Sequence, residues 1–499
     1  MRKPETQALA ETVASSDQLD SRIMRGSAWV AVSYGGRSAI SLLTMLALVR
    51  LLEPRAFGLV ALAWTLLIVC DQVQGAGTAS AFVYRRDQLE RAAATSAVFS
   101  WLSSIVLCGA AIAVAPLLAS AFRAPELTNV LRVLSLLLII KSVGTAPMAI
   151  LERNIDFRRR AKCEVTGALV QAAVSLPLAV TGAGVWALVA GQLAGAAVQS
   201  AIAWVVVPWR PDPRKASFRL AREMFRYGRY VSATNVVNLA NNTIDNLVVG
   251  RLLGTATLGF YSVAFRLADF PNTVIGHVVG RVMFPIYSLL QNEVDRFRNA
   301  YVQNLQRIAV FALPVSVGVL VAADLIVRGL LGDRWEQAIT PLRILAAYGI
   351  VKSFVAPSGE VFKGAGKPHL GLVFGVLQIA ITAPALAVLV PRYGLAGAAF
   401  AMLTAMTVCG VVRLAISLRI VKATAGELAR ALAPPALCAL VLGATLELLL
   451  PPARMLGPAA GLAALVAIGC VVYLGATLAF ARSVVGPMWV GLRGAGLGT

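Results

Sequence analysis

The sequence predicts an all-α integral membrane protein of about fourteen transmembrane helices: two six-helix bundles related by a pseudo-two-fold repeat, plus two C-terminal helices. Its composition excludes a soluble protein, because 58% of its 499 residues are hydrophobic and only 14% are charged, with a mean hydropathy of +0.76. Apolar windows of about 20 residues recur along the whole chain. A turn near the start of the chain recurs near its middle, which indicates a duplicated fold.

The duplicated turn defines the repeat. Leu-Val-Arg-Leu-Leu at 48–52 recurs 201 residues later as Val-Gly-Arg-Leu-Leu at 249–253, and the two copies are followed at equal spacing by Gly58 and Gly259. Leucines coincide easily by chance, so the spacing carries more weight than the identities. An even number of helices in each repeat makes the two halves parallel, related by an axis along the membrane normal.

Each predicted helix is an apolar window bounded by polar or turn-forming residues. In chain order the predicted helices are 26–52, 57–83, 93–121, 127–151, 162–182, 185–208, 227–252, 258–285, 300–331, 336–363, 369–390, 394–419, 427–450 and 456–481. The first six belong to one half and the next six to the other. The last two are additions.

These helices give five predicted regions. They are a cytoplasmic N-terminal tail (1–25), an N-terminal six-helix bundle (26–208), a cytoplasmic basic connector (209–226), a C-terminal six-helix bundle (227–419), and two additional helices with a C-terminal tail (420–499). The tail is polar and lacks the apolar core of a signal peptide. The connector follows a Pro-Trp-Arg-Pro-Asp-Pro break and is predicted to be an amphipathic interfacial helix.

Lysine and arginine are concentrated in the loops of one side of the predicted helices, at 2–25, 85–91, 153–162, 210–229, 296–298, 367 and 419–430. The opposite side shows only Arg55, Arg123, Arg334, Arg392 and Arg454. The positive-inside rule then places both termini in the cytoplasm of a multi-pass inner-membrane protein. Most of the +21 net charge is explained by this topology. Anionic membrane lipids are therefore the expected partners of the basic loops, and no nucleic acid is expected.

The sequence lacks the residue patterns that several kinds of chemistry require. The six cysteines contain no Cys-x-x-Cys pair, and the two histidines, His277 and His369, are too few for a multi-histidine metal site. No nucleotide-binding loop or Gly-x-Ser-x-Gly elbow is present. The sequence therefore predicts no metal, no cofactor, no catalytic residues and no transport driven by ATP.

Ionisable residues inside the predicted helices are the candidate functional residues, because charge is costly in hydrocarbon. A basic cavity would suit the phosphates of a head group, since guanidinium groups donate paired hydrogen bonds to phosphate. The candidate head-group residues are Arg37, Lys141, Arg266 and Lys352. The candidate residues for ion coupling are three carboxylates, Asp71, Asp245 and Asp269.

The alternative is that these charges pair with one another and lock helices together. Arg266 and Asp269 are spaced for a local i,i+3 pair, and Asp71 and Asp245 could pair structurally or cap helix ends. Lys352, like Arg37, has no acid at helical spacing, which favours a water-filled cavity. Two further arginines, Arg50 and Arg251, occupy matched helix ends and are predicted to anchor at the outer interface.

Four segments resemble a known family: RGSAW at 25–29, VRLLEPRAFGLVA at 49–61, GVWALV at 184–189 and FPIYSLLQ at 284–291. They resemble the bacterial polysaccharide-transporter (Wzx-type) flippases of lipopolysaccharide and exopolysaccharide biosynthesis. This family is part of the multidrug/oligosaccharidyl-lipid/polysaccharide exporter superfamily. The resemblance spans roughly residues 20 to 420, and the 49–61 segment is the most specific.

The resemblance implies a membrane transporter that is not an enzyme. It would flip an undecaprenyl-pyrophosphate-linked oligosaccharide repeat unit from the cytoplasmic to the periplasmic leaflet by alternating access, for O-antigen, capsule or exopolysaccharide synthesis. A polysaccharide polymerase and a chain-length regulator are the partners it implies. Cavity arginines on the first and eighth helices would engage the pyrophosphate, and Arg37 and Arg266 lie on the corresponding helices here.

Two other functions remain open from the sequence. A multidrug-type antiporter of the same superfamily would need an acidic, aromatic site for organic cations, whereas the candidate set is basic. A membrane-bound polysaccharide polymerase or ligase usually carries its catalytic residues on a sizeable outer loop, and the predicted loops are all short. A third interpretation is that the protein is a scaffold that has lost its transport activity.

Overall fold

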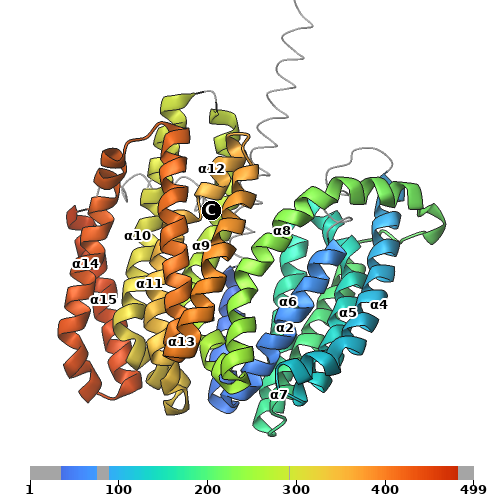
Figure 1. Cartoon of the computed structure of the whole chain (residues 1–499), viewed down its shortest axis with the longest axis horizontal. Helices are drawn as coiled ribbons and strands as arrows, with labels where there is room; N and C mark the ends of the chain where they lie inside the picture. Colours follow the sequence, from blue (N-terminus) through green and yellow to red (C-terminus); the bar gives the residue numbers. More distant parts are fainter. Residues whose placement is uncertain (1–34, 76–88, 155, 292, 481–499) are drawn as a thin grey trace, which may run out of the picture. The chain divides into compact units, whose positions relative to one another are not determined.

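The computed structural model describes residues 35–75, 89–154, 156–291 and 293–480, and these residues are almost entirely helical (Figure 1). The predicted tail 1–25, and the predicted helical residues 26–34 and 76–83, lie outside the described residues. The chain divides into two compact units. One contains the described residues within 1–51, 66–120 and 125–236, and the other contains those within 52–65, 121–124 and 237–499. The helices α2 (Pro54–Gly75) and α8 (Phe218–Leu253) each contribute to both units.

The first unit consists of antiparallel helices that pack through small side chains. They are a helix at residues 35–51, α4 (Leu89–Ala121), α5 (Glu126–Arg153), α6 (Phe157–Val180), α7 (Val185–Val206) and the short η1 (Pro213–Lys215), with parts of α2 (Pro54–Gly75) and α8 (Phe218–Leu253). A Cβ on Gly191 would lie 1.8 Å from the Ser175 hydroxyl. Glycine at this position therefore lets α6 and α7 approach closely, as small residues do between membrane helices.

The second unit holds the remaining helices. They are α9 (Thr255–Leu290), α10 (Val294–Ile326), η2 (Val327–Leu331), η3 (Asp333–Ala338), α11 (Ile339–Val355), α12 (Ser358–Gly364), α13 (His369–Val421), α14 (Ala425–Met455) and α15 (Pro458–Phe480). The last two form a hairpin whose buried leucines pack on α10. The basic segment predicted to be a separate connector is partly helix, because α8 already begins at Phe218.

The repeat is visible in the backbone of one turn. Gly184, which precedes α7, has φ 58° and ψ −129°, and Gly394, inside α13, has φ 56° and ψ −131°. This conformation is left-handed in φ and favours glycine. Gly394 divides α13 into two arms, which correspond to the two predicted helices at 369–390 and 394–419.

The duplicated turn contacts its own copy within the second unit. A Cβ on Gly58 would lie 1.7 Å from the carbonyl oxygen of Thr255, and a Cβ on Gly259 would lie 1.8 Å from that of Pro54. Pro54 and Thr255 are themselves 201 residues apart, so the two contacts are equivalent across the repeat. Each glycine thus lies against the first residue of the other copy's helix, α2 or α9.

Trp335 of η3 lies between the two copies of the turn. It is fully buried, and its ring meets Phe57 at a centroid distance of 5.4 Å and Phe260 at 5.6 Å. Both contacts are edge-on, a favourable arrangement of aromatic pairs. A residue from the second half therefore fixes both copies of the turn.

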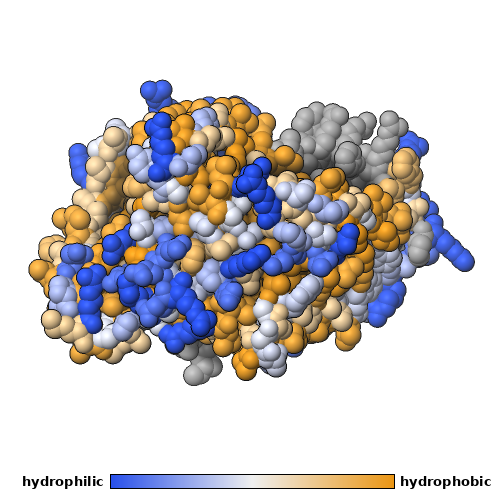
Figure 2. Space-filling view, turned by 60° about the horizontal axis from the view of Figure 1, so that its bottom comes forward, coloured by the Kyte–Doolittle hydropathy of each residue, from blue (hydrophilic) through white to orange (hydrophobic). Residues whose placement is uncertain are grey.

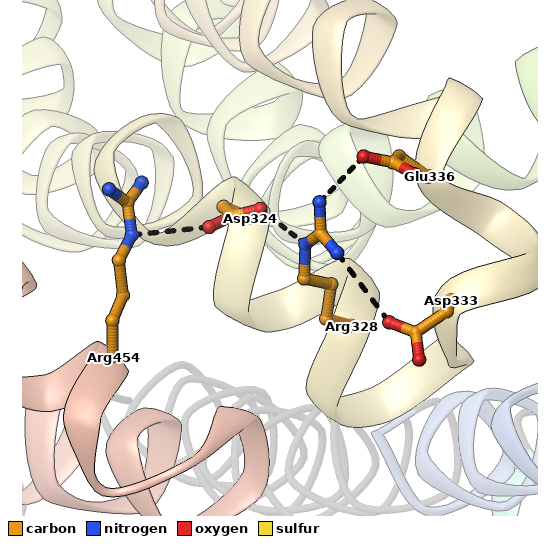
Figure 3. A network of polar contacts seen from close by, with 5 residues as sticks. All are labelled: Asp324, Arg328, Asp333, Glu336 and Arg454. Carbon is orange, nitrogen blue, oxygen red and sulfur yellow. Dashed lines mark hydrogen bonds and ion pairs between the residues drawn. The ribbon is translucent and has the colours of Figure 1, made fainter.

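An ionic network beside Trp335 ties the α14–α15 hairpin to this region (Figure 3). Asp324 of α10 accepts from Arg328 of η2 at 2.9 Å and from Arg454 of α14 at 3.2 Å. Arg328 also pairs with Glu336 at 2.6 Å and with Asp333 at 3.7 Å, both on η3. The Asp324 carboxylate is the one member that bonds to both arginines, and its side chain is 17% exposed.

We expect Asp324→Ala to destabilise the protein by about 1–2 kcal/mol, because two guanidinium groups lose their shared acceptor. The matched control is Asp295→Ala, which removes an acid that is 82% exposed and pairs with Arg298. Thermal unfolding of the purified protein in detergent checks the difference. An equal change in melting temperature for both variants would contradict a bracing role for the network.

The surface fits a membrane. Among the described residues, ten helices are long and apolar enough to cross a bilayer. In the space-filling view, hydrophobic residues cover much of the visible flanks, while hydrophilic residues gather on the end that faces the viewer (Figure 2). The predicted all-helical, multi-pass membrane architecture is confirmed.

Candidate functional site

Lys352 and Asp269 form an ion pair inside the second unit. The Lys352 Nζ lies 2.7 Å from Asp269 Oδ1, and the side chains are 25% and 15% exposed. The ammonium also lies over the Tyr348 ring, 5.7 Å from its centroid, a cation–π contact. Asp269 is on α9 and Lys352 on α11, so the pair joins two helices. Lys352 is therefore not the unpaired cation that the sequence favoured, and Asp269 bonds to a different cation from the Arg266 suggested by spacing.

Asp245 of α8 is buried beside this pair's helices. It is 1% exposed, and Oδ2 accepts a hydrogen bond from the Tyr261 hydroxyl at 2.9 Å. Its Oδ1 accepts from the backbone amide of Asn246 at 2.8 Å. Tyr261 contacts Phe265, which in turn contacts the ring of Tyr348. An aromatic path thus connects the Asp245 carboxylate to the ring under Lys352.

A second polar link between α9 and α11 involves residues that the sequence interpretation did not single out. The Ser353 hydroxyl donates to Asn272 Oδ1 at 2.6 Å, and the Asn272 amide donates to the Gly349 carbonyl at 3.2 Å. Asn272 follows Asp71 by the same 201 residues as the duplicated turn. That spacing was the signal that could have identified it.

Arg266 is a cation of the second unit that lies inside a long helix without an ion pair to another described residue. It is the twelfth residue of α9, about 16 Å along the helix axis at 1.5 Å per residue. It is exposed, and no described residue forms an ion pair with it. A guanidinium at this depth in a membrane helix is available to an anion that enters from outside the unit.

In the first unit, Arg37 is partly paired. Its guanidinium lies 3.9 Å from Glu164, and its side chain is 48% exposed. Glu164 is bound more closely by Arg160, at 3.0 Å, and Arg160 also pairs with Glu152 at 2.8 Å. The long, exposed contact of Arg37 contributes little stability, so this arginine can reorient toward a ligand at small cost.

Lys141 completes the set in the first unit. It is half-buried on α5, and its charge interacts with those of Asp71 and Arg37. Asp71 lies on α2, the second helix of its half, and Lys141 on the fourth helix. Asp269 and Lys352 occupy the second and fourth helices of the other half. Each half therefore carries a lysine and an aspartate on equivalent helices.

These side chains suit anion binding and proton or cation exchange better than metal binding. Among the described residues, no group of three His, Cys, Asp or Glu side chains could hold a metal ion. The second unit combines the exposed Arg266 with a neutralised lysine–aspartate pair. A strong anion that reached the pair would compete with the Asp269 carboxylate for the ammonium.

We expect the single variants Asp269→Asn and Lys352→Met each to lower stability by about 3 kcal/mol, because each leaves one charge without its partner. The double variant should recover most of that loss, since both charges are gone. We expect the double variant to regain stability but not transport. This result would distinguish a role in transport from a role in holding the two helices together. Recovery of both stability and transport would make the pair purely structural. Thermal unfolding and a transport assay on the same samples measure the two effects.

Comparison with known proteins connects this arrangement to a family. The polysaccharide biosynthesis protein family matches residues 47–340. The lipopolysaccharide biosynthesis protein WzxC of Escherichia coli is 22% identical over 379 residues, covering 74% of this chain and 75% of WzxC. The succinoglycan biosynthesis transport protein ExoT of Rhizobium meliloti is 27% identical, covering 73% of this chain and 74% of ExoT.

A solved structure gives the same fold. The lipid II flippase MurJ, in an inward closed conformation, superposes with a TM-score of 0.72 at 15% identity, covering 91% of this chain and 99% of MurJ. At that identity the likeness concerns the fold alone. The family match extends over more than half of the sequence, from the first copy of the duplicated turn to the start of α11. The chain belongs to the polysaccharide biosynthesis protein family.

Proposed function

We propose that this protein is a flippase that moves a polyprenyl-pyrophosphate-linked oligosaccharide across the membrane for polysaccharide biosynthesis. ExoT is named as a transport protein and MurJ as a lipid II flippase, which supports transport of a lipid-linked sugar. The relatives are named for biosynthesis of lipopolysaccharide, teichuronic acid and succinoglycan. These names share the biosynthesis of a product that contains a glycan.

The main support for this proposal is the position of Arg266. It is exposed deep along α9, and no described residue forms an ion pair with it. A charge at that depth is costly unless it serves a ligand or a water-filled space. We infer that Arg266 binds the pyrophosphate, with Lys352 as a second ligand from α11. For the first unit taken by itself, we propose that Arg37 and Lys141 also bind the head group.

The carboxylates suggest how transport is driven. Asp269 loses its lysine when a pyrophosphate draws Lys352 away, and a free buried carboxylate then favours uptake of a proton or a cation. We infer that Asp269, with Asp245 and Asp71, couples transport to an ion gradient in this way. The substrate is taken to be undecaprenyl-pyrophosphate-linked and to enter from the cytoplasmic leaflet. We propose that the protein lies in a bacterial inner membrane with both termini in the cytoplasm. We also propose a polysaccharide polymerase and a chain-length regulator as its partners.

Translocation in proteoliposomes tests this function. The purified protein is reconstituted, and movement of a fluorescent polyprenyl-pyrophosphate oligosaccharide between leaflets is followed by its accessibility to an added quencher. A parallel arm offers an organic cation such as ethidium. We expect movement of the lipid-linked sugar and none of the cation. Export of the cation without movement of the sugar would establish the multidrug-type function instead.

A further inference from the structure

A cavity of about 740 Å³ lies at one end of the second unit, away from the ion pair described above. It is formed where α9 ends and α10 begins, at the start of α13, and at the end of α13. This is the end of the unit that carries the α12 label in Figure 1. Its volume is within the range of pockets that bind small molecules, roughly 300–1,000 Å³.

The cavity is basic. Lys367, His369 and Arg419 line it, and its lining contains no carboxylate. None of the three forms an ion pair with another described residue. Nearby cations at the same end are paired: Lys363 lies 3.1 Å from Glu360, and Arg298 lies 3.0 Å from Asp295. The positive charge of the cavity is therefore not compensated by an ion pair with a described residue, whereas Lys363 and Arg298 at the same end are paired.

The rest of the wall is apolar. Phe297, Leu370, Ile416 and Ile420 line the cavity together with the basic residues. Phe297 belongs to a buried cluster with Tyr287 and Tyr301, so this wall is held rigidly. A free phosphate ion would leave such a surface in contact with water. A phospholipid would cover it with hydrocarbon while its phosphate meets the cations.

We propose that this cavity binds the head group of an anionic phospholipid, with its phosphate among Lys367, His369 and Arg419 and its acyl chains along the apolar wall. The positive-inside distribution predicts that Lys367 and Arg419 lie on the cytoplasmic side, where anionic lipids are attracted to basic segments. Lys367 and His369 stand at the start of α13, and Arg419 stands at its end. A bound lipid therefore links the two arms of this helix, which meet at the Gly394 kink.

Native mass spectrometry of the full chain in detergent, titrated with synthetic phosphatidylglycerol, tests the site. The variant is Lys367→Gln/Arg419→Gln. The matched control is Lys422→Gln/Arg430→Gln, which removes two exposed charges that do not line the cavity. We expect the dissociation constant of the tightest-bound lipid to rise about 25-fold in the variant, from roughly five-fold per basic residue. The control should match the wild type.

Three outcomes would overturn the proposal. Equal losses in the variant and the control would mean that lipid binding follows net charge alone. Equal binding of zwitterionic phosphatidylethanolamine would remove the need for an anionic head group. Displacement by millimolar inorganic phosphate, or by polyprenyl pyrophosphate at lower concentration than phosphatidylglycerol, would assign the cavity to a soluble anion or to the transported lipid. Lys367→Gln alone, outside the helices, is the second variant if the double one does not fold.

Discussion

Arg266→Gln is expected to lower the rate of substrate translocation about 100-fold, because the variant loses a paired, charge-assisted contact to the pyrophosphate worth roughly 3 kcal/mol. The side chain has no ion pair to another described residue, so its removal leaves no partner without its charge. Stability should therefore change little. Melting temperature and initial translocation rate, measured on the same purified samples, separate the two effects.

Two controls sharpen this test. Arg266→Lys keeps the charge but loses the planar fork, and we expect it to retain partial activity. Arg251→Gln removes an exposed arginine at the end of α8, in the duplicated turn, and should leave translocation within about two-fold of the wild type. Full activity in Arg266→Gln would mean that the head group binds elsewhere.

Gly58→Val and Gly259→Val are each expected to prevent assembly of the folded protein or to destabilise it by about 3 kcal/mol or more. The introduced Cβ would overlap a backbone carbonyl, of Thr255 in one case and of Pro54 in the other. A backbone atom cannot rotate away as a flexible side chain can. Because the contacts are equivalent, we expect the two variants to fail to a similar degree.

The control is glycine in an open helical position. A Cβ on Gly318 of α10 or on Gly109 of α4 would meet no atom within 4 Å. Gly318→Ala and Gly109→Ala should therefore be neutral or stabilising by up to about 1 kcal/mol, as expected for alanine in a helix interior. Size-exclusion profiles and thermal unfolding of the four variants check the contrast. Normal folding of Gly58→Val would show that the two copies of the turn can separate without loss of the fold.

Three of the four segments by which the sequence resembles its family lie at packing positions in the structure, and the fourth, 25–29, lies outside the described residues. The 49–61 segment contains Gly58, which meets the other half of the repeat. The 184–189 segment begins at Gly184, whose φ of 58° forms the α6–α7 turn. The 284–291 segment contains Tyr287, fully buried and bonded through its hydroxyl to Asn304. These motifs identify the fold because close packing tolerates few residue types.

The candidate site was only partly predictable. Burial cost marks any charge in an apolar helix, so Arg37, Arg266 and Lys352 could be selected from the sequence. Their partners could not, because Asp269 lies 83 residues from Lys352 and Glu164 lies on a different helix from Arg37. Helical spacing suggested Arg266 for Asp269, but in the structure Asp269 forms a salt bridge with Lys352.

The sequence by itself determined the membrane environment, the helices and the duplication, because each of these follows from local hydropathy and from spacing along the chain. Only the tertiary structure decided which charges neutralise one another and which remain available. Ion pairs between helices depend on distances of a few ångströms between residues far apart in sequence. That is why Arg266 emerges as an available cation and Lys352 as a paired one. The sequence marked Lys367 and Arg419 only as basic loop residues, and only the tertiary structure gathered them with His369 around one cavity.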